Sequence, residues 1–381
     1  MNIAYFLTYG YSLETWNESS TLEREVKYFN FLSKNLGYKF YIITYGNESD
    51  LKYSDLFSGS EIIPLYKHKK HYDSKLLNFL NSLTFPRKIK NIIKEDIHIT
   101  KQNQLLGSWV SFIFKKITSS KFFIRTGYDM YFFSRAEKKS YIKQKLYMLL
   151  TLFSLNSADL YSVTSKADYD FLLKTFKFKR KKLKILRNWV ETSQSIKSEN
   201  RNDKLVSIGR LEYQKNYQFL LKEISGQNIS LIIYGSGSQR EELLNLSKNL
   251  NVNLEIIDSI SNSELIDNLQ NSKYFILPSN YEGNPKALLE AMSVGCIVFA
   301  SNIKNHNEII NHRVNGFLFD LDSGSLKDVL NQVLNNSKFN KEELEFISKN
   351  AVKTIKNDYS ISKIFNEEKN MLDDLVNNGK Y

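Results

Sequence analysis

The sequence has one cysteine and no long apolar run, and each of these two shortages excludes a class of protein. Cys296 has no second cysteine with which to form a disulfide. It lies in an apolar run, so we expect a buried small side chain rather than a nucleophile. No window approaches the roughly 20 apolar residues of a membrane-spanning helix. The N-terminal residues lack a signal-peptide pattern and predict a first strand, so we expect a cytoplasmic protein.

Positive charge is concentrated in the first half of the chain. The 381 residues carry a net charge of +12, and residues 1–190 hold 32 Lys and Arg against 16 Asp and Glu. The remaining residues hold 21 against 25. A basic half favours an anionic partner such as a membrane surface, a polyphosphate or a nucleic acid, and the alternative is a solvated lysine-rich surface.

Short apolar runs alternate with longer helical patterns, which predicts an α/β fold with parallel sheets. Strands are expected first at Ile3–Leu7, Lys39–Thr44, Glu61–Leu65, Ile97–Thr100, Phe122–Arg125, Leu160–Thr164 and Lys184–Leu186. A second series is expected at Leu205–Gly209, Ser230–Tyr234, Leu254–Ile257, Tyr274–Leu277, Ile297–Ala300 and Phe317–Phe319. The helices expected in the first half are Leu22–Leu36, Ser74–Ile93, Leu105–Lys116, Glu137–Asn156 and Lys166–Thr175.

The two series predict two Rossmann-like domains, residues 1–190 and 204–355, joined by a polar linker at 191–203. A C-terminal helix at 356–381 is expected to pack back on the first domain. Open parallel sheets bind ligands beyond the carboxyl ends of their strands, so we expect the site in a cleft that the two domains face.

One cluster with the chemistry for phosphate binding follows the first strand of the second domain. Gly209 ends this strand and allows a sharp turn. Arg210 and Lys215 come next, and two cations there could neutralise a diphosphate, the arginine through a bidentate fork. Many loops between a strand and a helix carry such residues, so an ordinary loop is the alternative interpretation.

A second cluster begins after the strand that ends at Leu277. Glu282 lies in the loop, where a carboxylate can accept hydrogen bonds from sugar hydroxyls. Pro285 suits the first position of a helix, which needs no amide donor there. The free N–H groups of residues 286–288 would then form an anion site together with the helix dipole. Glu290 lies further inside the helix, where its alternative role is that of a surface carboxylate.

Together, GRLxxxKN at 209–216 and PSxxEGxPxxxLEAMxxG at 278–295 resemble the retaining GT-B glycosyltransferases of group 1, which assemble bacterial polysaccharides and lipopolysaccharides. The resemblance implies that Arg210 and Lys215 bind the diphosphate of a nucleotide sugar, and that Glu282 contacts the transferred sugar and Glu290 the ribose. Arg210, Lys215 and Glu282 are thereby the expected catalytic residues. The expected donor site comprises Gly209, Arg210, Lys215, Tyr234, Gly235, Glu282, Gly283, Asn284, Pro285, Lys286, Ala287, Leu288 and Glu290.

The first domain is similar to the same family in a looser way. The resemblance implies contacts to the acceptor or the transferred sugar from Gly10, Lys101, Arg125, Tyr128 and Asp129. Two departures stand out, because the loop after the first strand has only Gly10 where many members have a glycine pair, and Tyr128 stands where many have a histidine. In the second domain, the resemblance extends to a further motif of the family, in which Glu308 is the acidic residue.

We therefore expect a sugar to move from a nucleotide diphosphate to a glycan or lipid-linked acceptor with retention of configuration. Glu282 would orient the sugar, and the leaving phosphate is the candidate base. No cofactor or metal is expected, since Asp320 and Asp322 suit a solvated turn and His68 and His71 lack further ligands. One alternative is an epimerase or hydrolase of sugar nucleotides with the same fold.

A second alternative is a non-enzymatic nucleic-acid binder, but it leaves both phosphate loops unexplained, so no nucleic-acid partner is expected. Basic, aromatic segments at 66–90 and 171–186 suggest peripheral attachment to an anionic membrane. The alternative is a helix that faces the core and carries solvated lysines.

Overall fold

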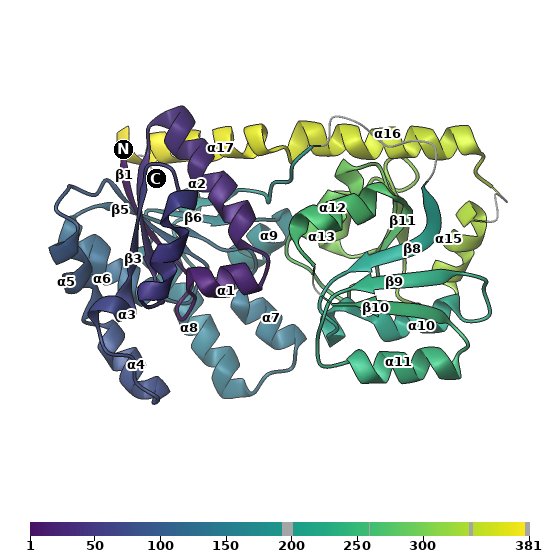
Figure 1. The fold of residues 1–381 in the computed structure, drawn as a ribbon, viewed down its shortest axis with the longest axis horizontal. Coiled ribbons are helices and arrows are strands. Elements are labelled where there is room, and N and C mark those ends of the chain that lie inside the picture. The colour runs from purple at the N-terminus through teal and green to yellow at the C-terminus, as the bar shows by residue number, and fades with distance from the viewer. Residues whose placement is uncertain (193–200, 259, 335–337, 378–381) are drawn as a thin grey trace. The chain divides into compact units, whose positions relative to one another are not determined.

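The computed structural model describes residues 1–192, 201–258, 260–334 and 338–377. The chain forms two compact units (Figure 1). Unit 1 comprises residues 1–164, 168–186 and 365–381, and unit 2 comprises residues 165–167 and 187–364. Each unit is built on its own sheet.

Unit 1 contains a seven-stranded sheet with the order β3-β2-β1-β4-β5-β6-β7, in which every neighbouring pair is parallel. The strands are β1 (Asn2–Phe6), β2 (Lys39–Thr44), β3 (Ser60–Pro64), β4 (Ile99–Asn103), β5 (Lys121–Arg125), β6 (Leu160–Val163) and β7 (Leu183–Ile185). The α-helices are α1 (Leu13–Glu18), α2 (Leu22–Leu36), α3 (Leu65–His68), α4 (Lys75–Ser82), α5 (Phe85–Ile92), α6 (Ser108–Thr118), α7 (Met130–Ala136), α8 (Tyr141–Ser157) and most of α9 (Lys166–Thr175).

Unit 2 contains a six-stranded parallel sheet with the order β10-β9-β8-β11-β12-β13. Its strands are β8 (Asn202–Ile208), β9 (Ser230–Tyr234), β10 (Asn253–Ile257), β11 (Ser272–Leu277), β12 (Ile297–Ser301) and β13 (Phe317–Phe319). Its α-helices are α10 (Tyr217–Ile224), α11 (Arg240–Asn249), α12 (Asn262–Gln270), α13 (Lys286–Ser293), α14 (Lys304–Asn307), α15 (Ser325–Leu334) and α16 (Lys341–Asp358).

The central strands of unit 2 are apolar on both faces. Leu205 and Ile233 pack into one buried cluster, whereas their neighbours Val206 and Ile232 pack into another on the opposite face. Successive side chains of a strand point to opposite faces, so a sheet covered by helices on both sides needs apolar residues in succession. This is why the strands read as short, continuous apolar runs in the sequence.

The structure confirms the α/β class with two parallel sheets, and each expected strand occurs within a few residues of its predicted bounds. The single helix expected at Ser74–Ile93 is wrong, because the chain forms α4 and α5 with a break at 83–84. Pro86 explains the break, since its ring would clash with the carbonyl four residues earlier in a continuous helix. Of the expected linker 191–203, residues 193–200 lie outside the described residues, and β8 already begins at Asn202.

The last helix, α17 (Ile361–Asn377), joins unit 1 from Phe365 onward. Phe365 contacts the ring of Tyr28 on α2, with ring centroids 5.3 Å apart. Glu368 forms a buried ion pair with Lys101 of β4 and accepts a hydrogen bond from the Tyr28 hydroxyl at 2.8 Å. Burial alone would raise the pKa of Glu368, but the Lys101 ammonium outweighs it and holds this pKa below its ordinary value. Residues at the end of the chain thus complete the core of unit 1.

Within the described parts of the chain, no helix combines the length and the apolar character needed to cross a bilayer.

We predict that Glu368→Gln destabilises the protein by about 3–5 kcal/mol, because it leaves the Lys101 ammonium buried without its counterion. Urea denaturation followed by circular dichroism measures this loss. The matched control is Lys369→Gln on the same helix, which breaks the half-exposed pair with Asp373 and should cost no more than about 1 kcal/mol. Equal losses in the two variants would contradict the role assigned to the buried pair.

Candidate active site

The candidate site of unit 2 lies at the carboxyl edge of its sheet. Strand β8 pairs with β9 on one side and with β11 on the other. Since the three strands are parallel, the loops that follow them begin at the same edge. These loops carry the residues 209–216, 235–237 and 278–285, which include most of the expected donor site.

Glycines allow two of these loops to touch through their backbones. The Gly209 N–H donates to the Tyr234 carbonyl at 3.0 Å. A Cβ atom at Gly235 would lie 2.1 Å from the Gly209 carbonyl oxygen, and one at Gly237 would lie 2.5 Å from the Leu211 carbonyl oxygen. Any side chain at either position would push the loops apart. The glycine turn at 234–237 therefore supports the loop that carries Arg210.

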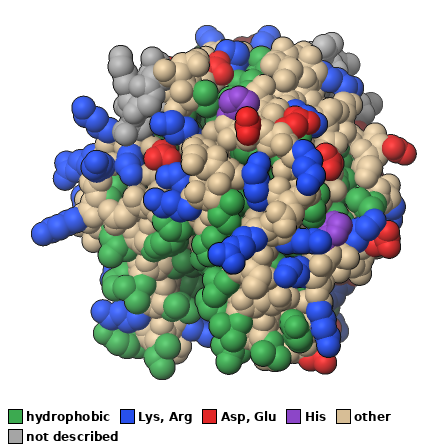
Figure 2. Space-filling view, turned by 90° about the vertical axis from the view of Figure 1, so that its left-hand side faces the viewer, with side chains coloured by type: hydrophobic (Ala, Val, Ile, Leu, Met, Phe, Trp, Pro, Cys, Tyr) green, Lys and Arg blue, Asp and Glu red, His purple; other side chains and the backbone are tan. Residues whose placement is uncertain are grey.

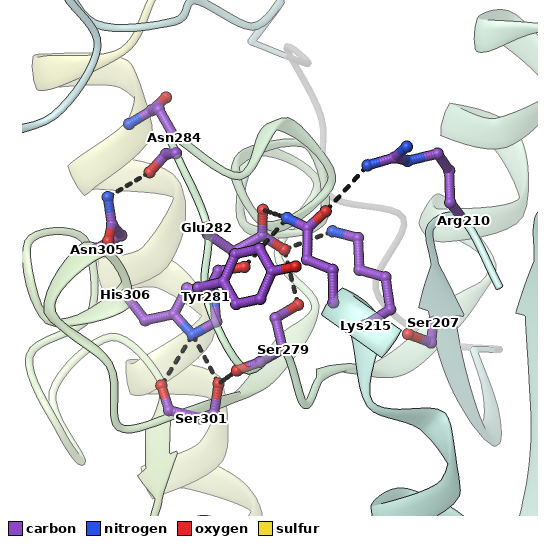
Figure 3. A network of polar contacts seen from close by, with 12 residues as sticks. Ser207, Arg210, Lys215, Ser279, Tyr281, Glu282, Asn284, Ser301, Asn305 and His306 are labelled. Atoms are coloured by element: carbon purple, nitrogen blue, oxygen red, sulfur yellow. Dashed lines mark hydrogen bonds and ion pairs between the residues drawn. The ribbon is translucent and has the colours of Figure 1, made fainter. Parts of the chain in front are cut away.

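An ion pair joins the loop after β8 to the loop after β11 (Figure 3). Lys215 Nζ lies 2.5 Å from Glu282 Oε1, and the Ser279 hydroxyl donates to the same oxygen at 2.7 Å. Gln214 Nε2 donates to the other oxygen, Glu282 Oε2, at 3.3 Å. Arg210 Nη2 in turn donates to Gln214 Oε1 at 3.0 Å. The three residues expected to be catalytic are therefore connected in one polar network.

A second series of hydrogen bonds supports this loop from strand β12. The Ser301 hydroxyl donates to the Ser279 carbonyl at 2.6 Å. His306 Nδ1 donates to the Ser301 carbonyl at 2.8 Å, which fixes the tautomer of the neutral ring. Asn305 Nδ2 donates to the Gly283 carbonyl at 2.7 Å. The backbone before and after Glu282, at Ser279 and Gly283, is thus held by side chains from the β12–α14 segment (Figure 3).

Burial and charge set the protonation of the site. Burial alone would raise the pKa of Glu282, but the Lys215 ammonium and the Ser279 hydroxyl outweigh it, so this pKa is below its ordinary value. Burial lowers the pKa of His306 to about 4, and Lys215 contributes in the same direction. At neutral pH the site therefore holds a carboxylate at Glu282 and an uncharged imidazole at His306.

Helix α13 begins one residue later than expected. Pro285 is its N-cap, with an extended backbone, and Lys286 is the first helical residue. The Leu288 N–H donates to the Pro285 carbonyl at 3.1 Å, so the prediction that this group is free is wrong. Lys286 Nζ lies 2.8 Å from Glu290 Oε1. Glu290, the expected contact to the ribose, therefore forms an ion pair with a lysine of its own helix, and both side chains are largely buried.

Two buried atoms of this region have no hydrogen-bond partner among the described residues, namely Asn284 Oδ1 and His306 Nε2. The side chain of Asn284 is 9% exposed, and that of His306 is fully buried. Buried polar atoms are nearly always hydrogen-bonded in folded proteins, so each orphan requires an explanation. With Nδ1 carrying the proton, His306 Nε2 is an acceptor, as is the amide oxygen of Asn284. Both could accept a hydrogen bond from a bound ligand.

The residues expected on the acceptor side lie in unit 1, and only some of them are exposed. Gly10 is an exposed turn residue with φ +83°, and Tyr128 is 40% exposed. Lys101 is buried in its pair with Glu368. Asp129 is also buried, and it caps α7 by accepting from the Phe132 N–H at 2.7 Å. Burial raises the pKa of Asp129 to about 6. Arg125 ends β5 and is partly buried.

Other predicted residues have structural partners. Glu308 accepts hydrogen bonds from the N–H groups of Lys166 and Ala167 at 2.7 and 2.6 Å, within unit 2. Asp320 accepts from Asn302 Nδ2 at 2.7 Å. Cys296 is buried, as expected. The described parts of the chain contain no group of three or more His, Cys, Asp or Glu placed to hold a metal ion.

The sequence analysis did not single out the residues that support Glu282: Gln214, Ser279, Ser301, Asn305 and His306. Ser279 and Ser301 lie at the carboxyl ends of β11 and β12, where sites of parallel sheets are built, so strand position could have identified them. Gln214 carried no such signal, because its partner Glu282 lies 68 residues later. His306 carried none because it supports the loop only through Ser301, whose own partner Ser279 lies 22 residues earlier.

Comparisons with known proteins agree with this geometry. Residues 190–354 match the family model "Glycosyl transferases group 1". The capsular polysaccharide biosynthesis glycosyltransferase CapH of Staphylococcus aureus is 31% identical over 188 residues, which is 46% of this chain and 45% of CapH. A UDP-Gal:alpha-D-GlcNAc-diphosphoundecaprenol alpha-1,3-galactosyltransferase of Escherichia coli is 30% identical over 180 residues, which is 45% of each chain.

The chain thus spans about half the length of these curated relatives. Among solved structures, HepE from Anabaena, in complex with UDP and glucose, has a TM-score of 0.74 at 15% identity. That likeness covers 98% of this chain and 99% of HepE, and it shows that the two chains share the GT-B fold. The family model is matched across the sheet and loops of unit 2, so this part of the chain is similar to the group 1 glycosyl transferases.

Proposed function

We propose that the protein is a retaining glycosyltransferase that moves a sugar from a uridine diphosphate donor to a lipid-linked glycan acceptor in the synthesis of a cell-surface polysaccharide. The observation that carries the proposal is the network of Arg210, Lys215 and Glu282 at the carboxyl edge of the unit 2 sheet. Two cations and an ionised, buried carboxylate there suit a ligand that has phosphates at one end and hydroxyls at the other.

The cations would act on the leaving group. Breaking the bond between the anomeric carbon and the phosphate oxygen leaves negative charge on the diphosphate. Arg210 is exposed, and its guanidinium can bind two phosphate oxygens at once. Lys215 Nζ is already fixed by Glu282, so it needs little reorganisation to stabilise the charge that develops. Both side chains thereby favour the transition state over the bound donor.

The loop after β11 would bind the sugar. Glu282 is ionised and accepts hydrogen bonds, which suits the orientation of sugar hydroxyls rather than nucleophilic attack. Asn284 Oδ1 is a buried acceptor that no described residue contacts through a hydrogen bond, and a hydroxyl of the donor sugar would supply one. Glu290, one helical turn inside α13, would accept from the ribose, and the glycines at 209 and 235 would let the diphosphate approach the backbone.

The acceptor and the nucleotide are proposed from the relatives. The Escherichia coli relative is named for a UDP-galactose donor and an acceptor linked to diphosphoundecaprenol, and HepE was solved with UDP. CapH is named for capsular polysaccharide biosynthesis. Tyr128 and the turn at Gly10 are the exposed members of the proposed acceptor side, and Arg125 is partly exposed.

We predict that Arg210→Ala weakens the binding of UDP by about 10- to 100-fold, because it removes a charge-assisted contact to the diphosphate. Calorimetric titration with UDP and UMP measures the effect, and the variant should lose most of the preference for UDP. Arg240→Ala, which removes another arginine of unit 2, is the matched control and should bind UDP normally. Equal affinities of the unmodified protein for UDP and UMP would rule out the diphosphate site.

Transfer is tested with UDP-sugars and a lipid-linked glycan acceptor. Release of UDP should require the acceptor, and Arg210→Ala should lower turnover by about 10²–10³-fold. Hydrolysis of the donor at the same rate without acceptor would instead support the hydrolase alternative.

We predict that Asn284→Ala lowers the rate of transfer by about tenfold and leaves the stability of the free protein unchanged. The amide oxygen has no partner among the described residues, so its removal breaks no hydrogen bond that the structure shows. Steady-state kinetics and thermal unfolding are measured on the same preparations. Thermal destabilisation that matches the loss of activity would contradict a contact made only with substrate.

The neutral, buried His306 predicts a pH dependence of stability. Its folded pKa of about 4 lies below the ordinary value of 6.5, so the unfolded state binds this proton first as the pH falls. The folded state should therefore lose up to about 3 kcal/mol between pH 7 and pH 4, with no further loss from this group below. His306→Asn should show a smaller loss over that interval in urea denaturation. Identical pH profiles of the two proteins would show that His306 is not buried in the neutral form.

A further inference from the structure

Four neighbouring strands of unit 1 are each followed closely by an aromatic residue. The strands lie in the order β3-β2-β1-β4, and the residues that follow them are Tyr66, Tyr45, Tyr9 and Trp109. Since the strands are parallel, their carboxyl ends share one edge of the sheet, which is where open α/β sheets bind ligands. We call these four residues the aromatic edge. It contains no residue of the proposed donor site, which lies in unit 2.

Backbone hydrogen bonds and ring contacts hold the aromatic edge together. The N–H groups of Tyr66, Tyr45 and Tyr9 donate to carbonyls in the loops after β2, β1 and β4, at 2.9, 2.9 and 3.0 Å. The ring of Tyr9 packs on two others, with centroids 4.9 Å from that of Tyr45 and 5.1 Å from that of Trp109. Groups that are already arranged in the free protein lose little entropy when they bind a ligand.

Three buried polar atoms at this edge lack a hydrogen-bond partner among the residues that the structure describes: Tyr9 Oη, Tyr45 Oη and Gln102 Oε1. Tyr45 is 4% exposed, and Gln102 of β4 is fully buried. The orientation of the Gln102 amide follows from its Nε2, which lies 3.0–3.3 Å from three backbone carbonyl oxygens. Its Oε1 is therefore an acceptor that no described group satisfies.

Tyr45 and Gln102 lie against the same glycine. A Cβ atom at Gly107 would lie 3.2 Å from the Tyr45 hydroxyl oxygen and 3.3 Å from Gln102 Nε2. Burial raises the pKa of Tyr45 well above its ordinary value, and the phenol groups of Tyr9 and Tyr66 add to this. The Tyr45 hydroxyl thus stays protonated at neutral pH. A donor and an acceptor are therefore close together beneath the aromatic rings.

The aromatic edge is only partly covered by its neighbours. Tyr9, Tyr66 and Trp109 are each partly exposed. Phe79 on α4, whose ring lies 5.4 Å from that of Trp109, is 42% exposed. The interpretation of this segment as a helix that faces the core is therefore wrong for α4.

The surface at this end of the sheet is apolar and hollowed. In Figure 1, β1 begins at the top of unit 1, and because all seven strands are parallel, their carboxyl ends point to its lower side. Figure 2 shows hydrophobic side chains gathered in the lower part of the molecule, with a hollow between them. Hollows lined by aromatic side chains and a few polar groups are typical of sites for small ligands.

The chemistry of the aromatic edge suits a sugar ring. Aromatic faces pack against the C–H groups of a pyranose, and the three orphaned polar atoms match its hydroxyls. An isoprenoid or acyl chain would leave those atoms without hydrogen bonds, which costs free energy. A phosphate would meet no cation among the four aromatic residues and Gln102, whereas phosphate sites are built from charged donors.

We propose that the aromatic edge is a subsite for an uncharged sugar ring of the acceptor, with Tyr9 and Trp109 against the ring and Tyr45 and Gln102 hydrogen-bonded to its hydroxyls. The orphaned atoms are out of contact with solvent in the free protein, so a side chain turns aside when the sugar enters. Tyr9 is the partly exposed residue that packs on Tyr45, and such rotamer changes are common on binding. Only the identification of the sugar as part of the acceptor rests on the proposed function.

Saturation-transfer nuclear magnetic resonance tests the subsite on the full chain without any transfer reaction. The probes are the methyl glycosides of glucose, galactose, N-acetylglucosamine and N-acetylgalactosamine. We expect at least one of them to bind, with saturation passing from the protein to the C–H protons of its ring. Tyr45→Phe should weaken this binding about tenfold, because it removes one hydrogen bond to the sugar. Absence of binding by all four glycosides would overturn the proposal.

Tyr161→Phe is the matched control for the loss of a buried hydroxyl. The Tyr161 hydroxyl also lacks a partner among the described residues, but this tyrosine belongs to β6 and packs into a different buried cluster. The control should bind the glycosides as the unmodified protein does. Equal weakening in Tyr45→Phe and Tyr161→Phe would refute the subsite.

Thermal unfolding of the same variants excludes a purely structural role. Tyr45→Phe breaks no hydrogen bond that the structure shows, so its unfolding temperature should equal that of the unmodified protein. A lower unfolding temperature with unchanged glycoside binding would identify an internal water as the partner of the hydroxyl, and the proposal would fail. If Tyr45→Phe does not fold, Tyr9→Phe removes the hydroxyl of the partly exposed tyrosine and should also weaken glycoside binding about tenfold.

Binding of UDP reports on the donor site separately. Tyr45→Phe should bind UDP normally and should raise the KM for the acceptor in the transfer assay. Normal UDP binding without glycoside binding would overturn the sugar subsite alone. Glycoside binding without UDP binding would instead contradict the proposed transfer function and leave the subsite standing.

Discussion

The ion pair of Lys215 and Glu282 connects the two loops on which the rest of the candidate site depends. Glu282 is 6% exposed, and a carboxylate this deep is stable in its charged form only with a cation and hydrogen-bond donors around it. Lys215, Ser279 and Gln214 supply them, and Gln214 in turn holds Arg210. The requirement to satisfy one buried charge thus positions the exposed cation that is proposed to receive the phosphate.

Much of this arrangement follows from local sequence. The strands were predictable because a parallel sheet covered on both faces needs continuous apolar runs, as at Ser230–Tyr234 and Phe317–Phe319. The loops of the site were predictable because glycine and proline mark the points where strands end and helices begin. Gly235 has no room for a side chain beside the Gly209 carbonyl, so its place in the sequence carries information about the loop that holds Arg210 and Lys215.

The rest depends on contacts between distant parts of the chain. Lys101 resembled a ligand-binding residue in its local sequence, yet its partner Glu368 lies 267 residues later. Asp129 followed a strand, as site residues do, but its side chain caps the next helix. His306 supports the β11 loop only through Ser301, which no local pattern indicates. The exposed apolar side chains of α8, at Ile142, Leu146, Leu149 and Phe153, were also missed. An apolar helical pattern alone does not tell whether neighbouring elements will cover the helix.

The return of α17 to unit 1 has a consequence for the order in which the chain acquires its structure. The strands of unit 1 are synthesised before those of unit 2, but the carboxylate that neutralises Lys101 is 267 residues further along the chain. During translation, β4 must therefore wait until all the strands of unit 2 have been made before its lysine finds a counterion. Unit 1 is begun before unit 2 and completed after it.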